Sequence, residues 1–228
     1  MGVGPSFATV ETDLTLAFLS GLEGPRLPRH AAPMVRALLC LFCLALPAAA
    51  GPPDIRRPDV VRLQMFDAAL GDALRQAFNG GDPDTLAILT EALSGPAQTH
   101  APEGEWACRT IKMGNILPIV AYGNFRCRIE ALGDGQWRLT KLTGSQRTTG
   151  NIQADTPYGG MLYLGVGHVG DVPAVSYADL PRRGQTPVSP NQTHADVGLF
   201  EMMGPNRARL LLPLPILESD FNILYFTR

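Results

Sequence analysis

The spacing of hydrophobic positions changes once along the chain, from a helical period to a strand period. Between residues 59 and 95, apolar side chains recur every three or four positions, which is typical of helices that bury one face. The first stripe consists of Leu63, Phe66, Leu70, Leu74 and Phe78. Asp59 precedes this stripe as an N-cap candidate and Gly80-Gly81 follows it, so we expect one helix between them.

A second helix is predicted directly after the glycine pair. Asp82 followed by Pro83 is the usual order of an N-cap and a first helical residue. Its apolar stripe consists of Leu86, Leu89 and Leu93, and a Gly-Pro pair at residues 95 and 96 ends it. The two segments together predict a helical hairpin over residues 59–95.

From residue 105 onward the apolar positions alternate with polar ones, which is the pattern of half-buried strands. Trp106 and Cys108 share one face of the first strand, and Phe125 and Cys127 share one face of a later strand. A Gly-Asp-Gly turn at residues 133–135 leads into another alternating strand. Further candidate strands cover residues 148–153, 161–166, 197–203, 207–212 and 221–227. About eight short strands in residues 105–228 predict a mainly β (α+β) fold, a small antiparallel barrel or a sandwich, preceded by the hairpin.

Residues 171–196 interrupt this rhythm with four prolines and scattered polar side chains. A loop of this length inside a compact domain is usually functional or disordered, and it can also cover the edge of the domain. The sequence leaves these alternatives open.

The N-terminal segment indicates where the protein resides. Arg36 is followed by a short apolar run, residues 37–46, and then by small residues up to Ala50. This order is typical of a secretory signal peptide, and the run is shorter than the roughly 20 apolar residues of a membrane span. We therefore interpret residues 34–50 as a signal peptide cleaved between Ala50 and Gly51, and residues 1–33 as a mis-called or extended N-terminus. Residues 51–228 are expected to form a single periplasmic or secreted domain without a membrane span.

Two cysteines leave with the signal peptide, and Cys108 and Cys127 remain. In an oxidising compartment this pair predicts a structural disulfide, whereas a redox-active pair normally has Cys-x-x-Cys spacing. Both cysteines lie on the aromatic face of their strands, as a cross-strand disulfide requires. Direct pairing of the two would place Arg109 opposite Arg126, so we expect either splayed strands or an anion between these arginines.

The net charge of the chain and the positions of its arginines indicate which kinds of ligand it can bind. The formal net charge is −2, and the absence of a basic excess argues against nucleic acid. Four arginines, Arg109, Arg126, Arg128 and Arg138, share the face opposite the aromatic residues of the predicted strands, and the first three are candidate ligand-binding residues. Such an array can hold a phosphate, a carboxylate or a lipid head group, or it can form a solvated outer face.

A second group of candidate binding residues lies in the polar segment 141–150. Ser145, Gln146 and Arg147 concentrate hydroxyl, amide and guanidinium groups where one strand turns into the next. These groups can bind a ligand, or they can satisfy the backbone of a tight turn.

The sequence contains no established catalytic signature. A G-x-G-x-x-G stretch at residues 165–170 follows an apolar strand, but the Val172-Pro173 pair after it cannot continue as a helix. We therefore expect a turn or a bulge there rather than a nucleotide cofactor. The histidines lack the spacing of metal ligands, and there is no G-x-S-x-G elbow. We expect no cofactor and no metal, and a hydrolase that uses His168 or His194 is the alternative function.

Several segments together resemble a bacterial protein family. They are Cys108-Arg109-x-x-Lys112, Phe125-x-Cys127-Arg128, the Lys-Leu-Thr-Gly-Ser-Gln-Arg run at residues 141–147, Arg207-x-Arg209-Leu210, Pro213-x-Pro215 and Glu218-Ser219. These motifs are similar to those of the "domain of unknown function 4893" family, and the run at 141–147 is the most specific of them. The resemblance implies an exported protein without an assigned activity, and it supplies no catalytic residues.

The predicted function is therefore that of an exported, non-catalytic module. It would bind a small apolar or anionic ligand in the barrel mouth, or an envelope protein. A cavity lined by Trp106, Phe125 and Trp137 would favour the ligand, whereas a filled core would favour the protein partner. The alternative hydrolase would need a histidine within hydrogen-bond reach of a serine or an acid.

Overall fold

The computed structural model describes residues 54–228, except for residues 155, 159, 172–173 and 190–191. The predicted signal peptide, its cleavage site and residues 1–33 lie outside the described residues. Among the helices of the described part, none has the length and hydropathy that a membrane crossing requires.

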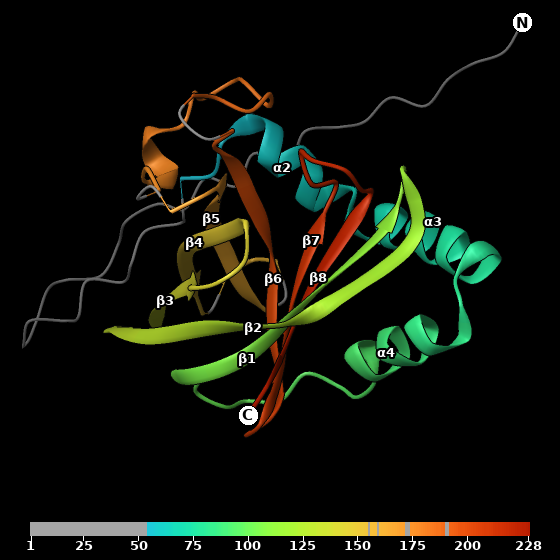
Figure 1. The fold of residues 1–228 in the computed structure, drawn as a ribbon. Coiled ribbons are helices and arrows are strands. Elements are labelled where there is room, and N and C mark those ends of the chain that lie inside the picture. The colour runs from blue at the N-terminus through green and yellow to red at the C-terminus, as the bar shows by residue number, and fades with distance from the viewer. Residues whose placement is uncertain (1–53, 155, 159, 172–173, 190–191) are drawn as a thin grey trace, which may run out of the picture. The chain divides into compact units, whose positions relative to one another are not determined.

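Antiparallel strands close into an eight-stranded barrel in which each strand pairs with its neighbours in chain order (Figure 1). The strands are β1 (Gly104–Gly114), β2 (Leu117–Gly133), β3 (Gln136–Lys141), β4 (Gln146–Gln153), β5 (Met161–Val169), β6 (His194–Gly204), β7 (Arg207–Pro213) and β8 (Phe221–Thr227). Pairing of β1 with β8 closes the sheet. The predicted mainly β fold is confirmed, and of the two predicted architectures the barrel is the one that forms.

Three helices precede the barrel in the described part of the chain. They are α2 (Arg57–Gln64), α3 (Phe66–Gly80) and α4 (Pro83–Leu93). The predicted first helix is thus two helices, which meet at Met65. Asp59 does not cap this segment, because it lies inside α2 and forms ion pairs with Arg56 and Arg62. A buried carboxylate between two arginines and an N-cap carboxylate look alike in sequence, which explains this wrong prediction.

The other helix-end prediction is confirmed. The Asp82 carboxylate accepts a hydrogen bond from the backbone N–H of Thr85 at 2.9 Å and caps α4. Phe78, which was predicted to face the core, is 62% exposed near the end of α3. The buried face of this helix follows Ala69, Ala73 and Ala77, and Phe78 lies off that face.

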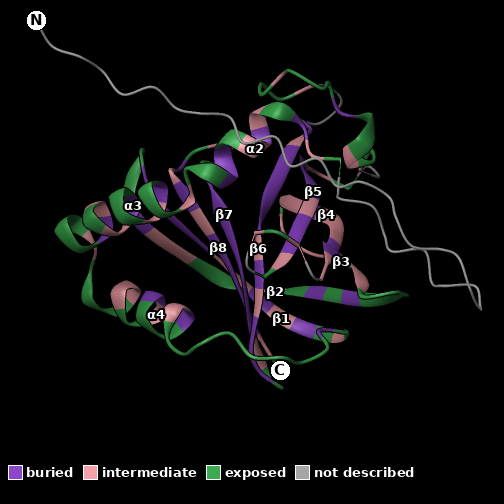
Figure 2. Ribbon diagram, turned by 180° about the vertical axis from the view of Figure 1, so that it is seen from behind, coloured by how far each residue is buried: buried purple, intermediate pink, exposed green. Residues whose placement is uncertain are grey.

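Alternation along the strands divides their side chains between two apolar layers. The inward side chains fill the barrel, and the buried aromatic residues among them include Trp106, Phe200 and Phe226. Outward side chains such as Ile111 and Ile223 pack against α3 and α4. Figure 2 shows buried positions along β6, β7 and β8, whereas much of β2 is exposed. Helices α3 and α4 thus cover β1, β7 and β8 but only part of β2.

A third apolar cluster lies on the outside of β5 and β6, where α2 and residues 174–189 cover the barrel. Arg56 anchors this segment, because its Nε donates to the carbonyl of Pro181 at 2.9 Å and its backbone N–H donates to the Tyr177 hydroxyl. Leu180 is buried in the same cluster. Of the alternatives for the long loop, its described residues therefore cover the edge of the barrel.

The predicted disulfide between Cys108 and Cys127 is confirmed, with the two Cα atoms 5.9 Å apart. The two cysteines are not directly opposite each other, because Cys127 pairs with Trp106 in the register of β1 and β2. The expected clash of Arg109 with Arg126 therefore does not arise. Arg109 lies opposite Asn124 instead, and its Nε donates to the Asn124 side chain at 3.3 Å.

Candidate ligand site at the barrel mouth

The barrel interior changes from apolar to polar at one end, which we call the barrel mouth. Six buried or nearly buried polar side chains converge there from the ends of five strands. This mouth cluster consists of Lys112 on β1, Lys141 on β3, Thr148 on β4, His168 on β5, and His194 and Asp196 on β6. Together with their neighbours they line a cavity of about 70 Å³. Since buried charged groups are costly unless they are paired or functional, this cluster is the strongest candidate site.

Two glycines of β5 create the space that these polar groups occupy. A Cβ atom on Gly167 would lie 2.4 Å from His194 Nε2 and 2.8 Å from Asp196 Oδ2, and one on Gly165 would lie 2.2 Å from the Tyr163 hydroxyl. Both glycines stand inside a regular strand. The expectation of a turn or a bulge at the G-x-G-x-x-G stretch was therefore wrong for these positions, because the missing side chains serve packing inside the barrel.

Lys141 is the most unusual residue of the mouth cluster. It is 6% exposed, and its Nζ donates to the carbonyl of Gln146 at 2.5 Å and lies 3.9 Å from the centre of the Phe125 ring. Burial, together with the positive charges of Arg147 and Lys112, lowers the pKa of Lys141 to about 8. No ion pair among the described residues includes Lys141. The cluster thus holds a buried cation that has no anionic partner in direct contact.

Lys112 belongs to a hydrogen-bonded triad that lies across the mouth. Its Nζ contacts the Glu218 carboxylate at 2.5 Å and the Gln146 side-chain oxygen at 2.7 Å, and the Gln146 amide donates to Glu218 at 3.2 Å. The hydrogen bond from Lys112 is the main cause that holds the pKa of Glu218 below its usual range. Because Glu218 comes from the loop between β7 and β8, this triad connects that loop to β1 and β4.

His194 and Asp196 form the second charged pair of the cluster. His194 Nε2 lies 3.5 Å from the Asp196 carboxylate, and Nδ1 lies 2.8 Å from the carbonyl of Gln192. Burial alone would lower the pKa of His194, but the hydrogen bond and charge of Asp196 outweigh it and raise the pKa. Burial likewise opposes ionisation of Asp196, but its contacts with His194 and Thr148 hold its pKa below the usual range. Both shifts favour the charged forms of the pair.

The pKa of His168 is shifted in the opposite direction from that of His194. Burial and the nearby charge of Arg147 lower the pKa of its imidazole, which keeps the ring neutral. Its buried Nδ1 atom has no hydrogen-bond partner among the described residues. Because buried polar atoms are nearly always hydrogen bonded in native proteins, this nitrogen is an unsatisfied polar atom in a residue that lines the mouth cavity.

The structure brings some of the predicted site residues to the mouth and keeps others away. Gln146 and Arg147 line the 70 Å³ cavity, and Ser145 lines a neighbouring hollow that also contains Lys141. The remaining candidates, Arg109, Arg126 and Arg128, lie on the opposite side of their strands from the barrel interior. Arg109 contacts Asn124, Arg128 pairs with Glu105, and Arg126 is exposed.

Sequence reasoning missed the two lysines, although a signal was present. Lys112 and Lys141 are the only lysines of the chain, and each occupies the buried face of its strand in the alternation. A charged residue at a core-facing position is the pattern that would have identified them. Asp196 offers no such signal, because its strand was predicted to begin only at residue 197.

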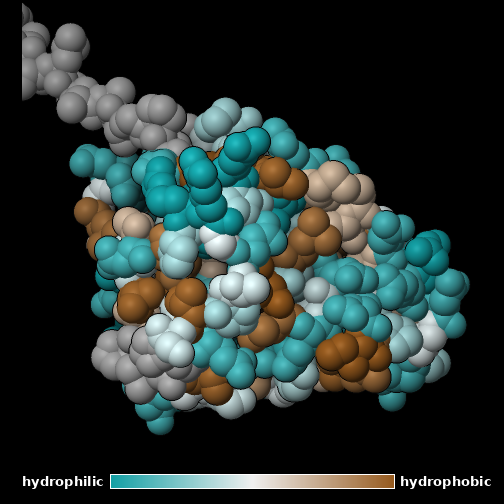
Figure 3. Space-filling view, turned by 90° about the horizontal axis from the view of Figure 1, so that it is seen from above, coloured by the Kyte–Doolittle hydropathy of each residue, from teal (hydrophilic) through white to brown (hydrophobic). Residues whose placement is uncertain are grey.

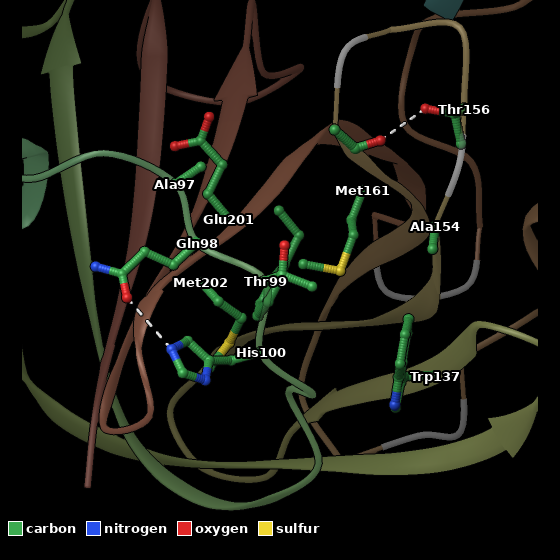
Figure 4. Close-up of a pocket in the computed structure, with 12 residues that line it drawn as sticks. Ala97, Gln98, Thr99, His100, Trp137, Ala154, Thr156, Met161, Glu201 and Met202 are labelled. Atoms are coloured by element: carbon green, nitrogen blue, oxygen red, sulfur yellow. Dashed lines mark hydrogen bonds between the residues drawn. The ribbon is translucent and has the colours of Figure 1, made fainter.

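A larger cavity, about 430 Å³, lies at the other end of β3, β5 and β6 (Figure 4). Its apolar lining includes Trp137, Met161 and Met202. Its polar groups are already paired: the His100 ring contacts Gln98 at 3.2 Å, and Glu201 accepts from Arg209 at 2.6 Å. This cavity therefore offers apolar surface but no unpaired buried charge.

The three aromatic residues whose common cavity would have favoured a ligand do not line one cavity. Trp106 is packed inside the barrel, Phe125 lines a hollow beside Lys141, and Trp137 lines the large cavity at the opposite end. The barrel interior is filled with side chains, and the candidate site lies at its mouth. Of the two outcomes named from the sequence, the filled interior is the one observed; by that criterion it favours a protein partner over a ligand inside the barrel, and leaves the mouth as the place for a ligand.

Comparison with known proteins identifies the family. The profile described as "Domain of unknown function (DUF4893)" matches residues 53–226, which span nearly all of the described chain. No curated protein and no solved structure matches this chain. The matched segment contains every residue of the mouth cluster. This chain belongs to the DUF4893 family of domains of unknown function.

Proposed function

We propose that this protein is an exported, non-catalytic module that binds a small anionic ligand at the barrel mouth. The observation that carries the proposal is the buried Lys141 ammonium, which faces a cavity and has no carboxylate partner among the described residues. Lys112 and Arg147 line the same cavity, but each is ion-paired, with Glu218 and with Asp171, so the unbalanced positive charge comes from Lys141. A low-dielectric site with excess positive charge attracts an anion strongly.

The size of the cavity limits the anionic group. A water molecule takes about 30 Å³ of liquid volume, so the cavity of about 70 Å³ holds a group on the order of two waters in size. A carboxylate or an inorganic oxyanion is of this size. Such an anion would accept hydrogen bonds from the Lys141 ammonium. The unpartnered Nδ1 of His168 supports a polar occupant, because it could donate to an oxygen of the anion if that nitrogen carries the proton.

The alternative hydrolase is less well supported. The His194–Asp196 pair provides a histidine next to an acid, but Nδ1 and Nε2 of His194 both face acceptor oxygens. A ring whose two nitrogens both donate cannot take a proton from a nucleophile. The nearby Thr148 hydroxyl is hydrogen bonded to Tyr163 at 2.8 Å. This geometry favours a fixed electrostatic framework over an acid–base pair.

Isothermal titration calorimetry tests the proposed site with three probes: inorganic phosphate, sulfate and acetate. We expect saturable binding of at least one probe to the wild type, and loss of that binding in Lys141→Met, which removes the charge and keeps the length. The matched control is Arg138→Met, which removes an exposed cation from the same strand and should bind like the wild type. Binding that Lys141→Met leaves unchanged, or no binding of any probe, would overturn the proposal.

Export rests on the predicted signal peptide and is consistent with the disulfide. Expression with the native N-terminus followed by intact mass measurement of the periplasmic fraction tests it. We expect a chain that begins at Gly51 and carries one disulfide between Cys108 and Cys127. A full-length, reduced chain in the cytoplasm would contradict this part of the proposal.

A further inference from the structure

An extra residue in β2 turns a row of apolar side chains toward the mouth. In the pairing of β1 with β2, Arg109 lies opposite Asn124 but Ile111 lies opposite Ala121, so β2 has one residue more than β1 in this interval. Such a bulge shifts the alternation of the strand. As a result Val120 and Tyr122, before the bulge, face the same side as Phe125 after it.

The two faces of this part of the β1–β2 hairpin differ in what covers them. On the outward face, Ile119 and Ile111 are buried beneath the helices. On the other face, the apolar side chains line an open hollow of about 200 Å³. We call the four apolar residues of this hollow, Ile116, Leu117, Val120 and Tyr122, the hairpin trough. Three of them are among the most exposed large apolar residues of the described chain: Ile116 at 68%, Leu117 at 53% and Tyr122 at 41%.

The hairpin trough is continuous with the cationic mouth. A hollow of about 190 Å³ lies between them and is lined by Lys141, Phe125 and Tyr122 among others. It shares Lys112, Lys141 and Gln146 with the 70 Å³ cavity, and it shares Lys112, Tyr122 and Glu218 with the trough. Figure 3 looks onto the molecule from the side of α2 and shows apolar patches among polar ones on this face. A molecule lying along these hollows would therefore meet cations at one end and apolar side chains at the other.

We propose that the ligand of the barrel mouth is amphipathic, with its anionic head on Lys141 and an unbranched apolar chain in the hairpin trough. This inference rests on the proposed function and adds the chemical class of the ligand. Exposed apolar side chains that line one hollow gain stability when a ligand covers them. The aliphatic stem of Lys112 and the Tyr122 ring, whose centre lies 5.9 Å from Lys112 Nζ, provide the transition between the two environments.

The affinity should rise with chain length. Burial of one methylene group contributes about 0.8 kcal/mol, which corresponds to about a fourfold gain in affinity for each methylene that the trough covers. Calorimetry with acetate, butanoate, hexanoate, octanoate and decanoate measures this slope directly. We expect a steep rise over the first members and a plateau when the chain extends beyond the trough.

Two variants test where the alkyl chain of the ligand lies on the protein. Ile116→Ser combined with Leu117→Ser changes two exposed positions at the hairpin tip, and it should flatten the slope while acetate affinity stays within about twofold. The matched control is Leu132→Ser, which removes an equally exposed apolar side chain at the far end of β2 and should leave the slope unchanged. A parallel sedimentation assay with vesicles of an anionic phospholipid distinguishes a membrane lipid from a free amphiphile as the source of the ligand.

The outcomes separate this inference from the proposed function. A flat slope with binding of acetate that depends on Lys141 would overturn the amphipathic ligand and leave the anion site intact. A steep rise of affinity with carboxylate length that the Ile116→Ser, Leu117→Ser double variant does not change would also overturn the inference, because the alkyl chain of the ligand would then lie outside the hairpin trough. Loss of all binding, including that of acetate, phosphate and sulfate, would overturn the proposed function itself.

Discussion

Replacing Lys141 by methionine should make the protein more stable at neutral pH, at the expense of ligand binding. The ammonium is buried at the barrel mouth, and its pKa is lowered from the ordinary 10.5 to about 8. At 1.36 kcal/mol per pKa unit, holding the charge in the folded state costs roughly 3 kcal/mol. The variant also loses the contacts with the Gln146 carbonyl and the Phe125 ring, which offset roughly 1–2 kcal/mol of this gain.

The pH dependence of this stability difference tests the reasoning better than its absolute value, because contributions that do not change with pH cancel. Below pH 8 Lys141 is protonated in both states, and the wild type carries the full cost. Between pH 8 and 10.5 the unfolded chain still binds this proton while the folded protein has released it, so wild-type stability rises with pH. The stability advantage of Lys141→Met over the wild type should therefore shrink by roughly 2–3 kcal/mol between pH 7 and pH 10.

Urea unfolding of both proteins, followed by tryptophan fluorescence at each pH, measures this difference. The control is Arg138→Met, whose difference from the wild type should not vary with pH because arginine stays charged throughout. Since all other titrating groups are shared, they cancel in each comparison. A constant difference between Lys141→Met and the wild type across this range would refute the claim that the folded protein holds Lys141 at a lowered pKa.

Three further predictions follow from other parts of the structure. Glu218→Gln should strengthen acetate binding in calorimetry, because it removes the carboxylate that competes for the mouth cations; unchanged or weaker binding would contradict this role. Replacing Cys108 and Cys127 together by alanine should lower the free energy of unfolding by about 3 kcal/mol, measured with urea, since the disulfide closes a loop of about 20 residues. Gly167→Ala should destabilise the fold by about 1–3 kcal/mol in the same assay, because its Cβ would meet the His194 ring. The control Gly71→Ala, in open space on α3, should stabilise it slightly, and equal effects would refute the packing argument.

Much of the fold follows from local sequence patterns. The change from a period of 3.6 to a period of 2 separated the helices from the strands, and β8 spans the predicted residues. The capping of α4 by Asp82 and the turn after β2 were predicted because their signals involve residues adjacent in sequence. The break at Met65 was missed because the apolar spacing continues across it, from Leu63 at the end of α2 to Phe66 at the start of α3.

The register between neighbouring strands could not be predicted from the sequence pattern and was seen only in the tertiary structure. Alternation defines which face a residue occupies, but it does not define which residue lies opposite. Cys108 and Cys127 were correctly placed on one face, whereas their diagonal arrangement, which keeps Arg109 away from Arg126, depends on the register of the whole barrel. The same alternation also fits a sandwich, so closure depends on whether the last strand pairs with the first.

The candidate site shows the same division most clearly. The sequence by itself determined that Gln146 and Arg147 lie in a polar segment beside a strand end, whereas the core-facing positions of the two lysines were overlooked although the alternation contains them. Only the tertiary structure brought Lys112, Lys141 and Asp196 together, because closing a barrel places the ends of strands distant in sequence around one mouth. The charge of that mouth is a sum over five strands, and each strand alone contributes no more than one or two of its groups.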